Sequence, residues 1–91
     1  MGNVILTEYA QEDLNKLNKT TLSRVIKALE RLDSNINLGK RLTGRLNMVY
    51  SYRFGTSQGE YRTAYLIENG KAVVIAIGPR ENFYRLLERR M

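Results

Sequence analysis

The dipeptide Asn69-Gly70 constrains the fold more than any other short feature, because it lies between two runs of strand-forming residues. A two-residue type I′ turn needs positive φ angles at both positions, and asparagine and glycine adopt them more easily than other residues. The run before the turn, residues 60–67, alternates along its length, and the run after it, residues 72–77, is apolar throughout. We therefore expect an antiparallel hairpin whose second strand is covered on both faces.

Two further strands are expected. Residues 48–54 alternate loosely and are rich in tyrosine, which predicts a strand that joins the hairpin through a loop at residues 55–59. Residues 3–7 form a short apolar run with β-branched side chains, which predicts a first strand.

Helices are expected in the first half and at the end of the chain. Thr7 can cap a helix that breaks at residues 18–19, and Thr20 or Thr21 then starts a second helix. The apolar residues of both helices recur at helical spacing, at Ala10, Leu14 and Leu17 and then at Leu22, Val25, Ile26, Leu29 and Leu32. Asn82 could cap a closing helix.

Together these elements predict an α+β domain in the order β-α-α-β-β-β-α, with a helical hairpin packed on a small, mostly antiparallel sheet. The 91 residues leave room for one core, so residues 1–91 are expected to form a single domain.

The composition excludes several kinds of chemistry. The chain has no cysteine and no histidine, so disulfides, thiolate nucleophiles, Ser-His catalysis and the usual transition-metal sites are not expected. Its nine carboxylates are scattered, and we expect neither a metal nor another cofactor. No apolar run approaches the roughly 20 residues that span a bilayer. No signal pattern opens the chain, so we expect a soluble cytoplasmic protein without membrane contact.

The positive charge is concentrated in the second half. Residues 1–39 carry five Lys/Arg and five Asp/Glu, whereas residues 40–91 carry ten Lys/Arg and four Asp/Glu and hold the whole net charge of +6. Such asymmetry favours a polyanionic partner, for example a nucleic acid or an acidic protein.

Four short motifs follow one another at a distinctive spacing: Leu42-Thr43-Gly44, Tyr-x-Tyr-Arg-Phe-Gly at 50–55, Glu-Tyr-Arg-Thr-Ala-Tyr at 60–65 and Gly-Pro-Arg-Glu-Asn-Phe-Tyr at 78–84. Together with the helical hairpin, they resemble the RelE/ParE toxin superfamily from Val4 to about Arg85. The resemblance implies the toxin of a type II toxin–antitoxin system. It also implies one of two activities: RelE-like members cleave messenger RNA, typically on the ribosome, and ParE-like members poison DNA gyrase.

The resemblance further implies three catalytic residues. The arginines of the family's phosphate site fall on Arg62 and Arg80, and the tyrosine that stacks on a base falls on Tyr84. A guanidinium group suits this role because its planar fork matches phosphate oxygens and keeps its charge. The structural alternative for Arg62 is an ion pair with Glu60 or Glu81.

Other basic and aromatic residues are expected to bind RNA, namely Lys40, Arg41, Arg45, Tyr50, Tyr52, Arg53 and Arg85. The general base stays open between Tyr50, Tyr52 and Lys40. Many relatives carry histidine just before the last motif arginine, but this chain has Pro79 there.

The favoured function is a metal-independent endoribonuclease that attacks messenger RNA, with the ribosome as a partner. The alternatives are a gyrase inhibitor of the ParE type and a basic interaction domain without enzymatic activity. Either toxin function implies a cognate antitoxin with an acidic, amphipathic segment, laid over the basic face or displacing the closing helix. The free toxin is expected to be a monomer.

Overall fold

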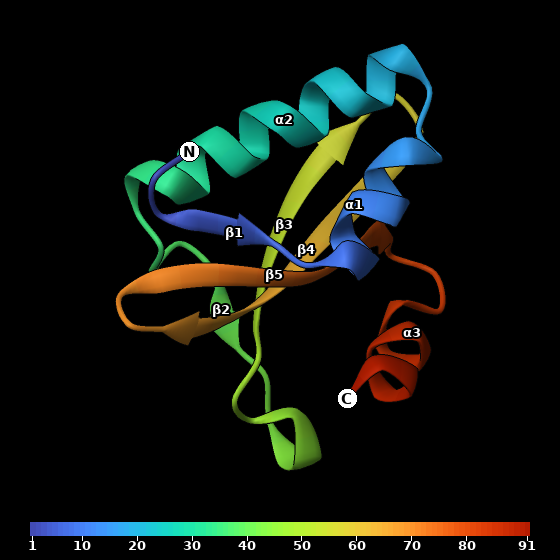
Figure 1. The fold of residues 1–91 in the computed structure, drawn as a ribbon. Helices are drawn as coiled ribbons and strands as arrows, with labels where there is room; N and C mark the ends of the chain where they lie inside the picture. Colours follow the sequence, from blue (N-terminus) through green and yellow to red (C-terminus); the bar gives the residue numbers. More distant parts are fainter.

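The structure is a computed structural model and describes residues 1–91. Three helices pack on a five-stranded sheet in the order β1-β5-β4-β3-β2 (Figure 1). The elements are β1 (Val4–Leu6), α1 (Glu8–Asn15), α2 (Lys19–Ser34), β2 (Lys40–Arg41), the 3-10 helix η1 (Gly44–Leu46), β3 (Tyr50–Thr56), β4 (Gly59–Glu68), β5 (Lys71–Pro79) and α3 (Phe83–Arg90). Only β1 and β5 pair in parallel, so the predicted α+β class and mostly antiparallel sheet are confirmed.

The hairpin between β4 and β5 forms as expected. Asn69 and Gly70 have φ angles of 52° and 74°, and Glu68 pairs with Lys71 directly beside the turn. The second strand of the hairpin, β5, lies between β1 and β4 and is buried along most of its length. This position explains why residues 72–77 carry no polar side chain.

The connection between β3 and β4 is tighter than the expected loop at residues 55–59. Both strands extend into that segment, so that Thr56 pairs with Gly59. Gly59 has a φ angle of 105°, and only residues 57–58 remain outside the two strands. The glycine makes this turn possible because side chains rarely tolerate such an angle.

The predicted starts of the first two helices compare differently with the structure. Thr7 caps α1 as expected, because its Oγ1 accepts from the backbone N–H of Ala10. The start of α2 at Thr20 or Thr21 was wrong, since the helix begins at Lys19 and the Oδ1 of Asn18 accepts from the N–H of Thr21 at 2.8 Å.

The end of the chain holds a similar difference. Asn82 precedes α3 with a φ angle of 61°, but its side chain makes no capping hydrogen bond. The residue turns the chain into the helix through its left-handed backbone instead.

None of the helices combines the length and apolar character that a membrane-spanning helix needs.

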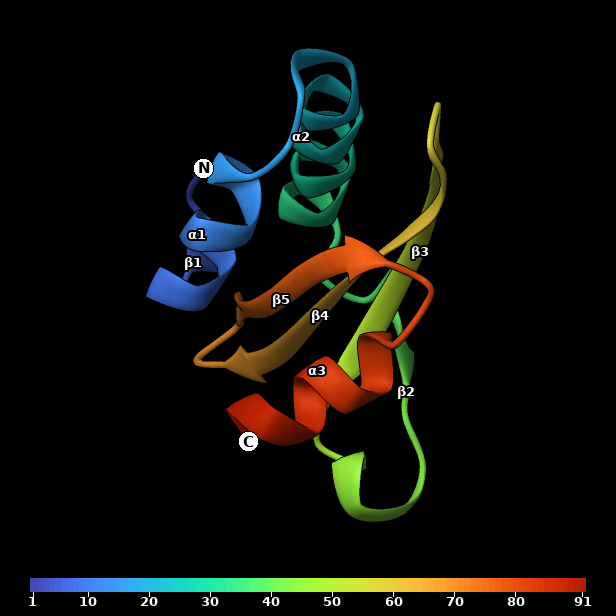
Figure 2. The same ribbon diagram turned by 90° about the vertical axis from the view of Figure 1, so that its right-hand side faces the viewer.

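The sheet is covered on both faces by different helices. Figure 2 shows α1 and α2 on one face and α3 on the other. Under α1 and α2, a core cluster includes Leu29, Leu32 and Tyr65, all fully buried. Under α3, a smaller cluster is built around Phe83 and Leu87. Alternate residues of β3 and β4 therefore reach two separate environments.

Beyond the end of β1, Asp13 and Arg90 supply the hydrogen-bond partners for the open edge of β5. The register between β4 and β5 shifts at Ala64/Tyr65 and leaves Ile75 without a pairing partner on β4. Arg90 donates to the carbonyl of Ile75 at 3.0 Å and to both carboxylate oxygens of Asp13, which accepts from the N–H of Ile77 at 2.9 Å. This ion pair also fixes the last turn of α3 to α1.

Candidate functional site

A hollow of about 190 Å³ lies on the α3 face of the sheet. It is lined by Lys40, Leu42, Ser51, Arg53, Arg62 and Tyr84. We call it the Arg62 hollow. Three of these residues are cationic and no carboxylate is among them, so the hollow is suited to an anionic ligand.

Arg62 and Tyr84 are in direct contact. Nη1 of Arg62 donates to the Tyr84 hydroxyl at 2.9 Å, and the guanidinium carbon lies 5.4 Å from the centre of the tyrosine ring. Phe83 is buried beneath α3 and packs edge-on against Tyr84, which fixes the start of the helix. The 46% exposure of Tyr84 leaves its ring accessible to a ligand.

Arg62 also forms the ion pair that was considered as its structural alternative. Its Nε donates to Oε2 of Glu60 at 2.9 Å, and the Arg62 side chain is only 11% exposed. Burial alone would lower the pKa of Arg62, but the contacts with Glu60 and Tyr84 raise that pKa above its usual value. Arg62 therefore stays cationic and oriented. Its second terminal nitrogen, Nη2, makes no hydrogen bond.

Arg53 lies directly opposite Arg62 in the pairing of β3 with β4. Side chains of like charge in facing positions of a sheet destabilise it. Glu60 compensates the positive charge of Arg62. Arg53, in contrast, is exposed and makes no ion pair or side-chain hydrogen bond. An anion bound between the two side chains would relieve this repulsion.

Arg80 is placed differently from the other two predicted catalytic residues. It follows β5, and its backbone N–H donates to the carbonyl of Glu60 at 3.1 Å. Its side chain is exposed, has no hydrogen-bond partner and does not line the Arg62 hollow. The structure thus brings the side chains of Arg62 and Tyr84 into contact. Arg80 is held near them only through its backbone hydrogen bond to Glu60.

The remaining predicted RNA contacts are spread over the surface. Arg41 donates to the carbonyl of Asn47, and Arg85 is exposed without a partner. Arg45 pairs with Glu88 at 3.0 Å, but its 90% exposed side chain gives this ion pair little weight.

Tyr50 and Tyr52 lie on the opposite face of β3 from the Arg62 hollow. Tyr50 stacks on Tyr65 at 5.5 Å between ring centres, and both Tyr50 and Tyr52 pack against the cluster under α1 and α2. Tyr50 and Tyr52 were predicted to bind RNA, as was Arg53, but neighbouring residues of a strand point to opposite faces, so the two tyrosines share no face of β3 with Arg53. Their RNA contacts and their role as candidate bases stay predictions.

Ser51 and Leu42 line the Arg62 hollow but were not among the predicted site residues. Ser51 is two residues from Arg53 on a strand, and this spacing alone puts the two on one face. Leu42 follows the short strand β2, whose pairing with β3 brings Lys40 opposite Ser51.

Most of the chain matches a known protein family. Residues 4–88 match the model of the ParE-like toxins of type II bacterial toxin–antitoxin systems. The chain therefore belongs to this toxin family. No curated protein sequence matches it.

Solved structures agree with the family. In the toxin–antitoxin complex RelBE2 from Mycobacterium tuberculosis, a chain of 30% identity aligns with a TM-score of 0.74, over 86% of this chain and 96% of that one. A mutant of the E. coli toxin RelE in the free state has the same fold, with 19% identity, a TM-score of 0.70 and coverage of 97% and 96%. A mutant E. coli RelE bound to an antitoxin RelBc peptide aligns with 25% identity and a TM-score of 0.64, over 94% and 90% of the two chains.

Proposed function

We propose that this toxin is a metal-independent endoribonuclease that cleaves messenger RNA on the ribosome and that a cognate antitoxin inhibits. One observation carries the proposal: Arg53 and Arg62 face each other across two strands, with Lys40 and Tyr84 around the same hollow. Such a cluster of like charges fits a phosphodiester, whose bridging phosphate can contact several cations at once.

The reaction would follow the route open to RNA without a metal. The 2′-hydroxyl attacks the adjacent phosphorus, the bond from phosphorus to the 5′-oxygen breaks, and a 2′,3′-cyclic phosphate forms. One proton leaves the 2′-hydroxyl, another reaches the departing 5′-oxygen, and the phosphorane between them gains negative charge.

Arg62 is assigned to stabilise the phosphorane. Its Nε and Nη1 are fixed by Glu60 and Tyr84, while Nη2 is free to meet a non-bridging oxygen. A donor that is already oriented costs no reorganisation when charge develops.

Tyr84 is assigned to protonate the leaving oxygen. Its hydroxyl oxygen accepts from Arg62, so its own proton is free to be donated elsewhere. Of the three candidate bases, only Lys40 lines the Arg62 hollow, so it is the candidate base that the proposal retains for the proton of the 2′-hydroxyl. Arg80 is assigned as a second phosphate ligand at the edge of the site.

The antitoxin part of the proposal is supported by the relatives. The similar chain from M. tuberculosis was solved as a toxin–antitoxin complex, and E. coli RelE was solved with a RelBc peptide. A chain with a net charge of +6 fits an acidic inhibitor.

Cell-free translation with the purified protein, followed by primer extension on the messenger, tests the nuclease. Cuts at discrete positions that need translating ribosomes are expected. Cuts on naked RNA as well would remove the ribosome from the proposal. Intact messenger with unimpaired translation would reject the nuclease, and accumulation of gyrase–DNA cleavage complexes would then identify a gyrase inhibitor. A chain that is harmless at every expression level would fit the non-enzymatic basic domain.

A further inference from the structure

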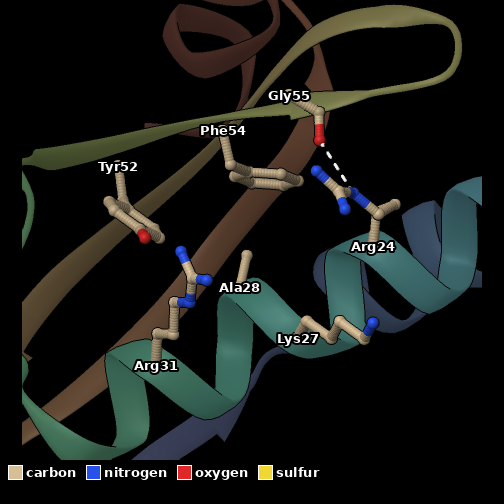
Figure 3. A pocket seen from close by; sticks show the side chains of 7 residues that line it. All are labelled: Arg24, Lys27, Ala28, Arg31, Tyr52, Phe54 and Gly55. Atoms are coloured by element: carbon tan, nitrogen blue, oxygen red, sulfur yellow. Dashed lines mark hydrogen bonds between the residues drawn. The ribbon is translucent and has the colours of Figure 1, made fainter.

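A second cationic site lies on the other side of the molecule, between α2 and β3. Its cavity of about 60 Å³ is lined by Arg24, Lys27, Ala28, Arg31, Tyr52, Phe54 and Gly55 (Figure 3). We call it the α2–β3 cleft. Tyr52 and Phe54 lie on the opposite face of β3 from Arg53, so this cleft is separate from the Arg62 hollow.

The cationic residues of the cleft lie around the small side chain of Ala28. Arg24, Lys27 and Arg31 are three and four residues apart on α2, which places them on one face of the helix. Ala28 is 4% exposed, and its methyl group leaves space between the two arginines. In Figure 3 the guanidinium groups of Arg24 and Arg31 extend past Ala28 toward the aromatic rings of β3.

The cleft has unused hydrogen-bonding capacity. Nε of Arg24 donates to the carbonyl of Gly55 at 3.2 Å, which holds the side chain in place while its terminal nitrogens make no hydrogen bond. Lys27 and Arg31 have no hydrogen bond or ion pair through their side chains, and no carboxylate lines the cleft. Like charges one turn apart on a helix repel each other, so a bound anion would stabilise the arrangement.

The surface beside the α2–β3 cleft indicates which class of anionic ligand fits it. Lys27 also lines a shallow groove of about 390 Å³ that contains the half-buried Leu22 and Ile26 together with Lys19, Ser23 and Glu30. The walls of the cleft itself include the rings of Tyr52 and Phe54. A ligand that uses the whole surface therefore needs carboxylates next to apolar side chains, which an amphipathic peptide offers and a phosphate backbone does not.

We propose that the α2–β3 cleft binds an acidic side chain of the antitoxin, with apolar side chains of the same segment in the groove beside Leu22 and Ile26. The inference rests on the antitoxin partner proposed above and is independent of the nuclease activity. It gives the inhibitor a contact that does not cover the Arg62 hollow.

Charge reversal tests this site. The probe is the small protein encoded beside the toxin gene, and its affinity is measured by titration calorimetry for the unmodified toxin, for Arg24→Glu and for Arg31→Glu. Each variant is expected to lose at least tenfold in affinity, because a close interfacial ion pair becomes a repulsion. Lys16→Glu makes the same change of charge at an exposed residue outside both sites and is expected to change the affinity less than threefold.

A compensating change locates the partner residue. The Asp and Glu residues of the antitoxin are changed to Lys one at a time and combined with Arg31→Glu, and one combination is expected to recover most of the lost affinity. Messenger cleavage without antitoxin is measured on the same variants and is expected to stay unchanged.

Three results would overturn the proposal. One is an affinity that Arg24→Glu and Arg31→Glu leave unchanged. Another is an equal loss in Lys16→Glu, which would show a general charge effect. The third is unchanged antitoxin affinity with reduced RNA binding or cleavage, which would assign the cleft to RNA phosphates. A toxin without nuclease activity but with the expected affinities would reject the proposed reaction and keep this site.

Discussion

Asp13 and Arg90 form a buried ion pair, with 2.7 Å between Asp13 Oδ2 and Arg90 Nη1 and 3.0 Å between Asp13 Oδ1 and Arg90 Nη2. The two side chains are 8% and 12% exposed. Both also bind backbone groups of β5, so the pair replaces a missing neighbour strand and fixes the helix that carries Tyr84.

Asp13→Ala is expected to lower the free energy of unfolding by about 3–5 kcal/mol, because it leaves Arg90 buried without its partner and the Ile77 N–H without an acceptor. Urea unfolding followed by circular dichroism measures the change. Arg89→Ala, at an exposed neighbouring residue, is expected to stay within about 0.5 kcal/mol of the unmodified protein. A loss below about 1 kcal/mol in Asp13→Ala would contradict the structural importance of the pair.

Tyr65→Phe is expected to cost about 1–2 kcal/mol at neutral pH. The Tyr65 hydroxyl donates to the carbonyl of Ile36 and accepts from the N–H of Gly39, and both groups would lose this partner. Tyr9→Phe is the control, because the Tyr9 hydroxyl makes no hydrogen bond. Thermal unfolding should separate the two variants, and equal melting temperatures would argue against the Tyr65 contacts.

Tyr65 also predicts a pH dependence at alkaline pH. Burial raises its pKa above the ordinary 10.0, the hydrogen bond from Gly39 lowers it, and the charge of Tyr50 raises it. The folded state therefore favours the protonated phenol. Its contribution to stability is complete below the unfolded pKa and is lost as the pH rises through the higher folded pKa. The fall in stability above about pH 10 should be steeper in the unmodified protein than in Tyr65→Phe, and parallel curves would refute this.

Tyr84→Phe is expected to reduce the rate of messenger cleavage about 100-fold or more, since it removes the proposed proton donor and keeps the ring. Stability is expected to change little because the residue is 46% exposed. Primer extension over a time course gives the rate. A rate equal to that of the unmodified toxin would remove the proton donor from the mechanism and leave only stacking.

Arg62→Lys is expected to reduce cleavage by about 100-fold or more, although it conserves the charge. An ammonium group cannot bind Glu60, Tyr84 and a phosphate oxygen with the geometry of a guanidinium. Arg89→Lys, at an exposed residue outside the Arg62 hollow, serves as the matched control and should cleave normally. Equal activity of the two variants would mean that only charge matters at Arg62.

Arg80→Ala is expected to abolish growth arrest, because it removes the proposed second phosphate ligand. The fold is expected to stay intact, because the side chain is exposed and makes no hydrogen bond or ion pair. Growth of cells that express the variant is compared with the circular dichroism spectrum of the purified protein. A folded Arg80→Ala protein of full toxicity would remove Arg80 from the catalytic residues.

Local patterns were sufficient to predict much of the fold. Asn69-Gly70 identified the central hairpin because its turn depends on two residues alone. Strand β2 was not expected, since it has two residues and too little sequence to show a period. The Asp13–Arg90 pair joins residues 77 positions apart, and no local pattern encodes such a contact.

The site was predictable to a similar extent. The contact between Arg62 and Tyr84 fits their assignment from family motifs, whereas their activity stays a prediction. Tyr50 and Tyr52 were grouped with Arg53 by their place in the sequence, but the two-residue period of a strand separates them. The α2–β3 cleft was not expected, because the alternating charges of α2 resemble an ordinary solvated helix until β3 lies against them.

The parallel pairing of β1 with β5 has a consequence for the time course of folding. Val4 pairs with Ala72, which lies 68 residues further along the chain (72 − 4), whereas β3, β4 and β5 follow one another through short turns. Contacts between distant segments form late because the loop between them must first be closed at a cost in entropy. We therefore expect the three-stranded meander to form before β1 and α1 dock. The buried Asp13–Arg90 pair, and the docking of α3 that it supports, would then be among the last contacts to form.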